Sequence, residues 1–67
     1  MSVYKSIEII AGSEKSWEDA ASNAVKEASK TVKNITGVWS KDQSATVVDG
    51  KITEYRVNCK ITFKIKS

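Results

Sequence analysis

The sequence predicts an α+β fold in which a three-stranded antiparallel sheet packs against one helix. Three observations support this fold class. Apolar residues recur every three or four positions over residues 16–34, as on one face of a helix. Residues 52–65 alternate between a mainly apolar and a mainly polar set, as in a strand with one buried face. Just before that segment, Asp49-Gly50 is a dipeptide typical of a two-residue hairpin turn.

The first strand is expected over residues 3–11, where β-branched residues are frequent. Its inward side chains are expected to be Val3, Ile7 and Ile9. The following segment 12–15, Gly-Ser-Glu-Lys, provides a turn into the helix.

The helix is expected over residues 16–34, with Ser16 capping its first turn and Gly37 lying just past its end. Its apolar stripe consists of Trp17, Ala20, Ala21, Ala24, Val25, Ala28, Val32 and Ile35. Because most of these residues are alanine, a sheet can approach closely but little apolar area is buried per residue. The 67 residues form one domain, 1–67, which is expected to need further copies of itself for stability.

The second and third strands are expected over residues 38–48 and 52–65, which gives the element order β-α-β-β. A fully antiparallel sheet then requires the last strand in the middle, in the order 1-3-2. The helix is expected to cover the third-strand face that carries Tyr55, Val57, Cys59, Ile61 and Phe63.

The hairpin turn also predicts which side chains share the face that the helix leaves uncovered. With Asp49 and Gly50 as the two loop residues, and with no bulge, Val48 pairs with Lys51. The expected pairs further along are Gln43 with Arg56, Lys41 with Asn58 and Trp39 with Lys60. Directly opposite residues lie on one face of a sheet, so Trp39 is expected among polar side chains outside the core.

An uncovered tryptophan among polar residues has two interpretations. Aromatic residues and arginine are enriched in subunit interfaces, and residue types alone favour this explanation. The alternative is a stacking platform for a planar ligand whose edge is held by the neighbouring polar groups.

Composition argues against several functional classes. The net charge is +3 with no dense basic run, so neither nucleic acid nor a membrane surface is an expected partner. The N-terminus lacks the apolar segment of a signal peptide, which favours a cytoplasmic location. The chain has no histidine, and its one cysteine, Cys59, falls in the inward set of the third strand. The acidic residues form no recognisable acid–base pair, so we expect a non-enzyme.

The chain resembles the dodecin family over nearly its whole length. The resemblance rests on several stretches in the same order: Val3-Tyr4-Lys5, Ile7-Glu8-Ile9-Ile10, Gly12-Ser13, Ser16-Trp17-Glu18, Ala20-Ala21, Ala24-Val25, Val48-Asp49-Gly50-Lys51, Tyr55-Arg56-Val57 and Phe63-Lys64. It implies a homo-oligomer of twelve subunits that form a hollow shell. Flavin-binding members stack riboflavin or FMN between tryptophans of two-fold related subunits and act as flavin stores rather than catalysts.

The resemblance also implies which residues bind the cofactor. The stacking tryptophan of flavin-binding members falls at Gly37 here, and Trp39 lies about 7 Å further along the strand. The glutamine that pairs with the flavin edge falls at Arg56, while Asp42-Gln43 matches an Asp-Gln pair of some flavin-binding members. The expected flavin site therefore comprises Trp39, Gln43, Arg56 and Asp42.

A second branch of the family supplies the alternative. It lacks the tryptophan, carries arginine at the position of Arg56, and resembles this chain at Met1-Ser2-Val3-Tyr4-Lys5. That branch is associated with calcium, which implies a structural shell that binds a divalent cation. No loop has the D-x-D-x-D-G spacing of a calcium site, so the sequence assigns no metal ligands.

Overall fold

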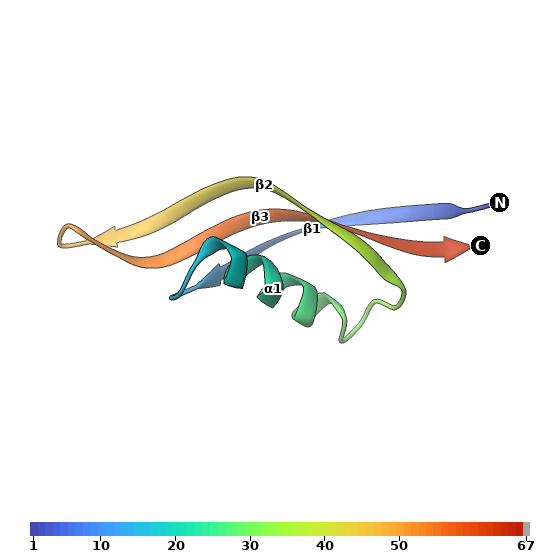
Figure 1. Ribbon diagram of the computed structural model, residues 1–67, viewed down its shortest axis with the longest axis horizontal. Coiled ribbons are helices and arrows are strands. Elements are labelled where there is room, and N and C mark those ends of the chain that lie inside the picture. Colours follow the sequence, from blue (N-terminus) through green and yellow to red (C-terminus); the bar gives the residue numbers. More distant parts are fainter. Residues whose placement is uncertain (67) are drawn as a thin grey trace.

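The computed structural model describes residues 1–66, in which three strands form one sheet against a single helix (Figure 1). The elements are β1 (Val3–Ser13), α1 (Trp17–Ala28), β2 (Ile35–Val48) and β3 (Lys51–Lys66). The sheet order is β1-β3-β2 with both pairings antiparallel. The predicted fold class and strand order are confirmed.

The core lies between α1 and the middle of β3. The buried residues of the helix are Ala20, Ala24 and Ala28, and those of β3 are Val57, Cys59 and Ile61. Small helical side chains let the two backbones approach closely, and Ile7 and Ile9 of β1 pack around the edge of this cluster. Cys59 is a free thiol inside the core, as its place in the alternation predicted.

The start of α1 was predicted correctly. The Ser16 hydroxyl accepts a hydrogen bond from the Asp19 backbone N–H at 2.9 Å. The Asp19 carboxylate in turn accepts a hydrogen bond from the Ser13 hydroxyl at 2.6 Å. These contacts join the end of β1 to the first turn of the helix, where an acidic side chain is also favoured by the helix dipole.

The predicted end of the helix at residue 34 was wrong, because α1 ends at Ala28. The N–H groups of Thr31 and Val32 both donate to the Ala28 carbonyl, at 3.1 and 2.8 Å, in turns rather than in a continuing helix. Both residues are β-branched and have low helix propensity. Asn34 then adopts a φ of 64° and redirects the chain into β2, which contains Gly37.

The hairpin between β2 and β3 has the predicted two-residue turn. Val48 pairs with Lys51, and Asp49 and Gly50 have φ values of 52° and 76°. Positive φ at both central residues is the property of a type I′ turn. In Figure 1 this hairpin extends beyond α1 at one end of the molecule, while both termini lie toward the other end.

The predicted register fails in the middle of β2 because two irregularities shift it and then restore it. The first lies between Thr46 and Val47, and the second lies between Ser40 and Asp42. Between them, the pairs are Asp42 with Asn58, Gln43 with Val57 and Ser44 with Arg56, instead of Lys41 with Asn58 and Gln43 with Arg56. Beyond the second irregularity the predicted pair of Trp39 with Lys60 is confirmed. Because side chains alternate between faces, a shift of one residue places Gln43 on the face opposite to the predicted one.

Within residues 1–66, no helix has both the length and the apolar character needed to cross a bilayer.

Candidate functional site

Trp39 lies on the outer face, which we define as the sheet face turned away from α1 and carrying Arg56, Asn58 and Lys60 on β3. Its side chain is 64% exposed. The Lys60 ammonium lies over the indole, 5.6 Å from the ring centroid. This distance is within the range of a cation–π contact. The outer face therefore presents a flat aromatic surface to solvent.

A row of polar side chains runs along β3 from this tryptophan. Lys60, Asn58 and Arg56 are alternate residues of one strand, so they share a face and follow one another at steps of about 6.6 Å. Arg56 is therefore about 13 Å along the strand from the position opposite Trp39. The row places a cation at each end and an amide in the middle.

Arg56 lies close to the acidic side chain of Glu54. Its Nε lies 3.8 Å from Glu54 Oε1, and both side chains are about half exposed. The Glu54 carboxylate occupies the space above Gly12 of β1, where a Cβ atom would meet Glu54 Oε2 at 2.6 Å. The pair is loose and solvated, so the guanidinium keeps most of its capacity to donate hydrogen bonds to another group.

The middle of the outer face contains an amide oxygen with an unused hydrogen-bonding capacity. Asn58 Oδ1 is buried and has no hydrogen-bond partner among the described residues. Asn58 lies opposite Ile10 on one side and Asp42 on the other. Beside this position, Lys41 of β2 reaches across β3 and contacts Glu8 of β1 at 3.3 Å. A buried oxygen without a hydrogen-bond partner is energetically unfavourable. Binding of a ligand or a neighbouring chain that donates a hydrogen bond to this oxygen is therefore favoured.

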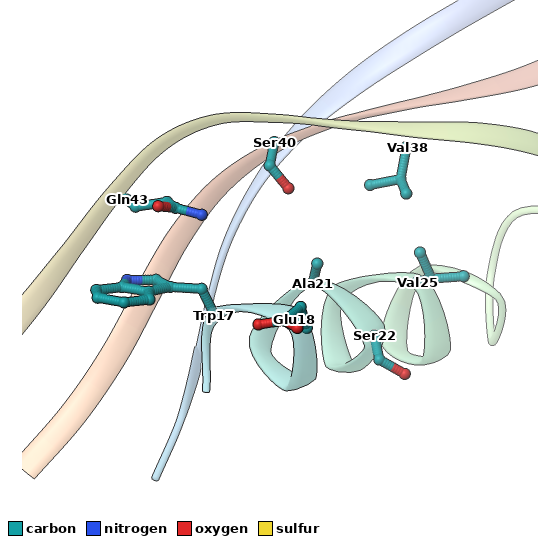
Figure 2. A pocket seen from close by; sticks show the side chains of 8 residues that line it. All are labelled: Trp17, Glu18, Ala21, Ser22, Val25, Val38, Ser40 and Gln43. Atoms are coloured by element: carbon teal, nitrogen blue, oxygen red, sulfur yellow. The ribbon is translucent and has the colours of Figure 1, made fainter. Parts of the chain in front are cut away.

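The structure thus brings Trp39, Asp42 and Arg56 to one face but places Gln43 on the other. Gln43 lies opposite the buried Val57 and lines a hollow of about 350 Å³ between α1 and β2. Figure 2 shows Gln43 and Trp17 at one end of this hollow, and Val38 and Val25 at the other. Sequence reasoning missed the displacement of Gln43 because β2 has no apolar alternation that would locate a bulge.

Trp17 packs against the sheet, as predicted. Its indole N–H donates to the Ser44 carbonyl at 3.0 Å. Its ring meets Tyr55 edge to face, with centroids 4.9 Å apart. These two contacts hold the indole at the mouth of the hollow.

No cluster of three or more histidine, cysteine, aspartate or glutamate side chains arranged to hold a metal ion occurs within residues 1–66. The chemistry that the outer face offers is recognition, through an aromatic plane, two cations and an amide that follow one another along the sheet.

Comparison with known proteins gives consistent matches. The Dodecin family model matches residues 3–66. The calcium dodecin of Mycobacterium tuberculosis is 43% identical over 67 residues, covering 98% of this chain and 93% of that protein. A crystal structure of the calcium dodecin of Mycobacterium tuberculosis, described as calcium chelating with a novel calcium-binding site, is 41% identical to this chain. The two superpose with a TM-score of 0.82, and the match covers 97% of this chain and 93% of that chain. A Thermus thermophilus dodecin variant is 27% identical with a TM-score of 0.92, and the match covers 100% of both chains.

Proposed function

Since this chain belongs to the dodecin family, we propose that twelve copies form a hollow shell that binds a flavin, riboflavin or FMN, on the outer face at Trp39. The shell stores or sequesters the flavin and catalyses no reaction on it. The observation that carries this proposal is the exposed indole of Trp39 on the face that α1 leaves uncovered.

The side chains around Trp39 fit the chemistry of a flavin. The ring system is flat and apolar enough to stack on an indole, and such stacking quenches the excited flavin. The edge of the ring needs donors for its carbonyl oxygens and an acceptor for its N–H group. Arg56 and the Asn58 amide supply donors, while Asn58 Oδ1 or the Asp42 carboxylate supplies an acceptor.

Arg56 favours FMN over riboflavin. A guanidinium binds phosphate through two parallel hydrogen bonds, whereas it adds little for a neutral ribityl chain. With Arg56 about 13 Å along β3 from the Trp39 position, a ligand stacked on Trp39 extends along the strand toward this cation. Gln43 faces the hollow instead, so the proposed contacts with the ligand come from Trp39, Asp42, Asn58 and Arg56.

A flavin titration tests the proposal. Riboflavin and FMN are titrated into the wild type, Trp39→Ala and Val38→Ala, and flavin fluorescence is followed. Val38 is the matched control, because it is the neighbouring residue and faces the hollow. We expect quenching by the wild type and Val38→Ala, and none by Trp39→Ala, with light scattering unchanged in all three. Unchanged quenching by Trp39→Ala would move the site elsewhere, and no quenching by the wild type would refute flavin binding.

A divalent cation is the second candidate, because the 43% identical relative is named calcium dodecin. On the outer face, the Asp42 carboxylate lies opposite Asn58, whose Oδ1 has no partner within residues 1–66. Oxygen atoms of carboxylates and amides are the ligands that calcium prefers. If calcium binds there, calcium raises the unfolding temperature of the wild type and of Asp49→Asn but not of Asp42→Asn. An equal rise in all three proteins would exclude Asp42 as a ligand.

A further inference from the structure

The hollow between α1 and β2 is a second feature of the molecule that the flavin proposal does not use. α1 packs over β1 and β3, so the inner face of β2 stands away from the helix flank (Figure 1). The resulting space has a volume of about 350 Å³. This lies at the lower end of the range of about 300–1,000 Å³ for sites that hold small organic molecules.

The hollow has an apolar body and polar groups at one end. Figure 2 shows Ala21 and Val25 of α1 facing Val38 and Ser40 of β2 across the space. Trp17 forms one end, and its ring is held by its hydrogen bond to the Ser44 carbonyl and by its contact with Tyr55. An aromatic wall held in this way loses little side-chain entropy when a ligand packs against it.

The Gln43 amide reaches the hollow because Gln43 lies between the two irregularities of β2, where the register is shifted by one residue. The shift that begins between Thr46 and Val47 places Gln43 opposite Val57, on the face of the hollow and beside Trp17. An amide offers both a donor and an acceptor next to the aromatic ring.

The hollow and the outer face differ in charge. Glu18 is the charged side chain among the described residues that line the hollow, whereas the outer face carries the cations Arg56 and Lys60 together with the carboxylates of Asp42 and Glu54. A carboxylate beside an indole favours a cation, both directly and through the cation–π attraction of the ring. The hollow therefore favours a cationic ligand.

We propose that the hollow between α1 and β2 binds a small aromatic amine, with its ring among Trp17, Val25 and Val38 and its ammonium group beside Glu18. The site is independent of the flavin site, since it lies on the other face of the sheet and shares none of the proposed flavin contacts.

The test uses Trp17 as its own reporter. The chain has two tryptophans, so the assembled Trp39→Phe variant leaves Trp17 as the single one. The probes are 2-phenylethylamine and 3-phenylpropionate, which carry the same ring on the same two-carbon spacer but opposite charges. We expect a saturable change in Trp17 emission with the amine, half complete at about 1–10 mM, and binding of the carboxylate about fivefold weaker.

Two further substitutions in that background locate the site. Glu18→Gln is expected to reduce the preference for the amine to below about twofold, whereas Glu14→Gln, in the turn before the helix, leaves it unchanged. Ala21→Leu fills the hollow and is expected to abolish the response, while circular dichroism and light scattering show an intact assembly. The proposal is refuted by the absence of a saturable response to the amine, by an equal response to both probes, or by an unchanged response in Ala21→Leu.

Discussion

Ile61 and Ile65 lie four residues apart on the same face of β3, yet their exposure differs completely. Ile61 is fully buried beneath α1, whereas Ile65 is 57% exposed beyond the end of the helix. The alternation of the third strand predicted the shared face. It did not predict how far along β3 the helix covers that face. That distance depends on the length of α1, which was overestimated.

The isoleucine pair gives a matched test of the core. Ile61→Ala is expected to lower the free energy of unfolding by about 2–5 kcal/mol, since it leaves a cavity in a packed cluster. Ile65→Ala removes the same atoms from a mainly solvated position and is expected to lower it by less than about 1 kcal/mol. Urea denaturation at one protein concentration measures both. Equal losses would mean that α1 does not cover Ile61.

Trp39 and Gln43 show how far the site could be predicted residue by residue. Trp39 pairs with Lys60 as predicted, because two irregularities in the hairpin cancel before that position. Gln43 lies between the two irregularities and therefore faces the hollow instead of the predicted outer face. The second strand is polar on both faces, so no burial pattern fixes its register, and an extra residue can be inserted without exposing a core side chain.

At the scale of elements, the β2–β3 hairpin was the best predicted part of the chain. Its turn depends on backbone conformation that few residues adopt, and Asp49-Gly50 is a sequence that adopts it readily. The start of the helix was also predicted correctly, from Ser16. The end of the helix was not, because the apolar spacing and the lysines typical of a helix continue beyond Ala28. Thr31, Val32 and Asn34 nevertheless end the helix locally.

Two glycines test the turn. Gly50 has a φ of 76°, so Gly50→Ala is expected to lower the free energy of unfolding by about 1–2 kcal/mol through backbone strain alone, as no atom lies within 4 Å of the new Cβ. Gly37→Ala also meets open space, but at a residue without a positive φ, and is expected to be neutral or stabilising. Thermal unfolding distinguishes them. A Gly37→Ala protein less stable than Gly50→Ala would contradict the type I′ turn.

Two serines test the helix start. Ser16→Ala removes the acceptor for the Asp19 N–H and is expected to lower the free energy of unfolding by about 1 kcal/mol. Ser22→Ala, an exposed position within α1, replaces serine by a better helix former and is expected to change stability slightly in the favourable direction. The same unfolding measurement compares them, and a neutral Ser16→Ala would show that the cap contributes nothing.

At the scale of the molecule, the single chain leaves much apolar surface uncovered. Its dimensions are 52 × 20 × 13 Å, and α1 covers only part of one sheet face. The large apolar side chains that remain exposed include Tyr4, Ile10, Trp39, Val47, Val48 and Ile52. Exposed apolar residues on an elongated sheet favour association with further copies, which supports the shell proposed above.

The most direct test of the central claim measures particle mass and flavin absorbance together. The protein is incubated with FMN, separated from free ligand by size exclusion, and followed by light scattering and visible absorbance. The account predicts a particle of about 89 kDa, twelve chains of 7.4 kDa each, that carries the blue absorbance of flavin, and a particle of the same mass without that absorbance for Trp39→Ala. A stable monomer, or an assembled wild type that elutes without flavin, would contradict the account.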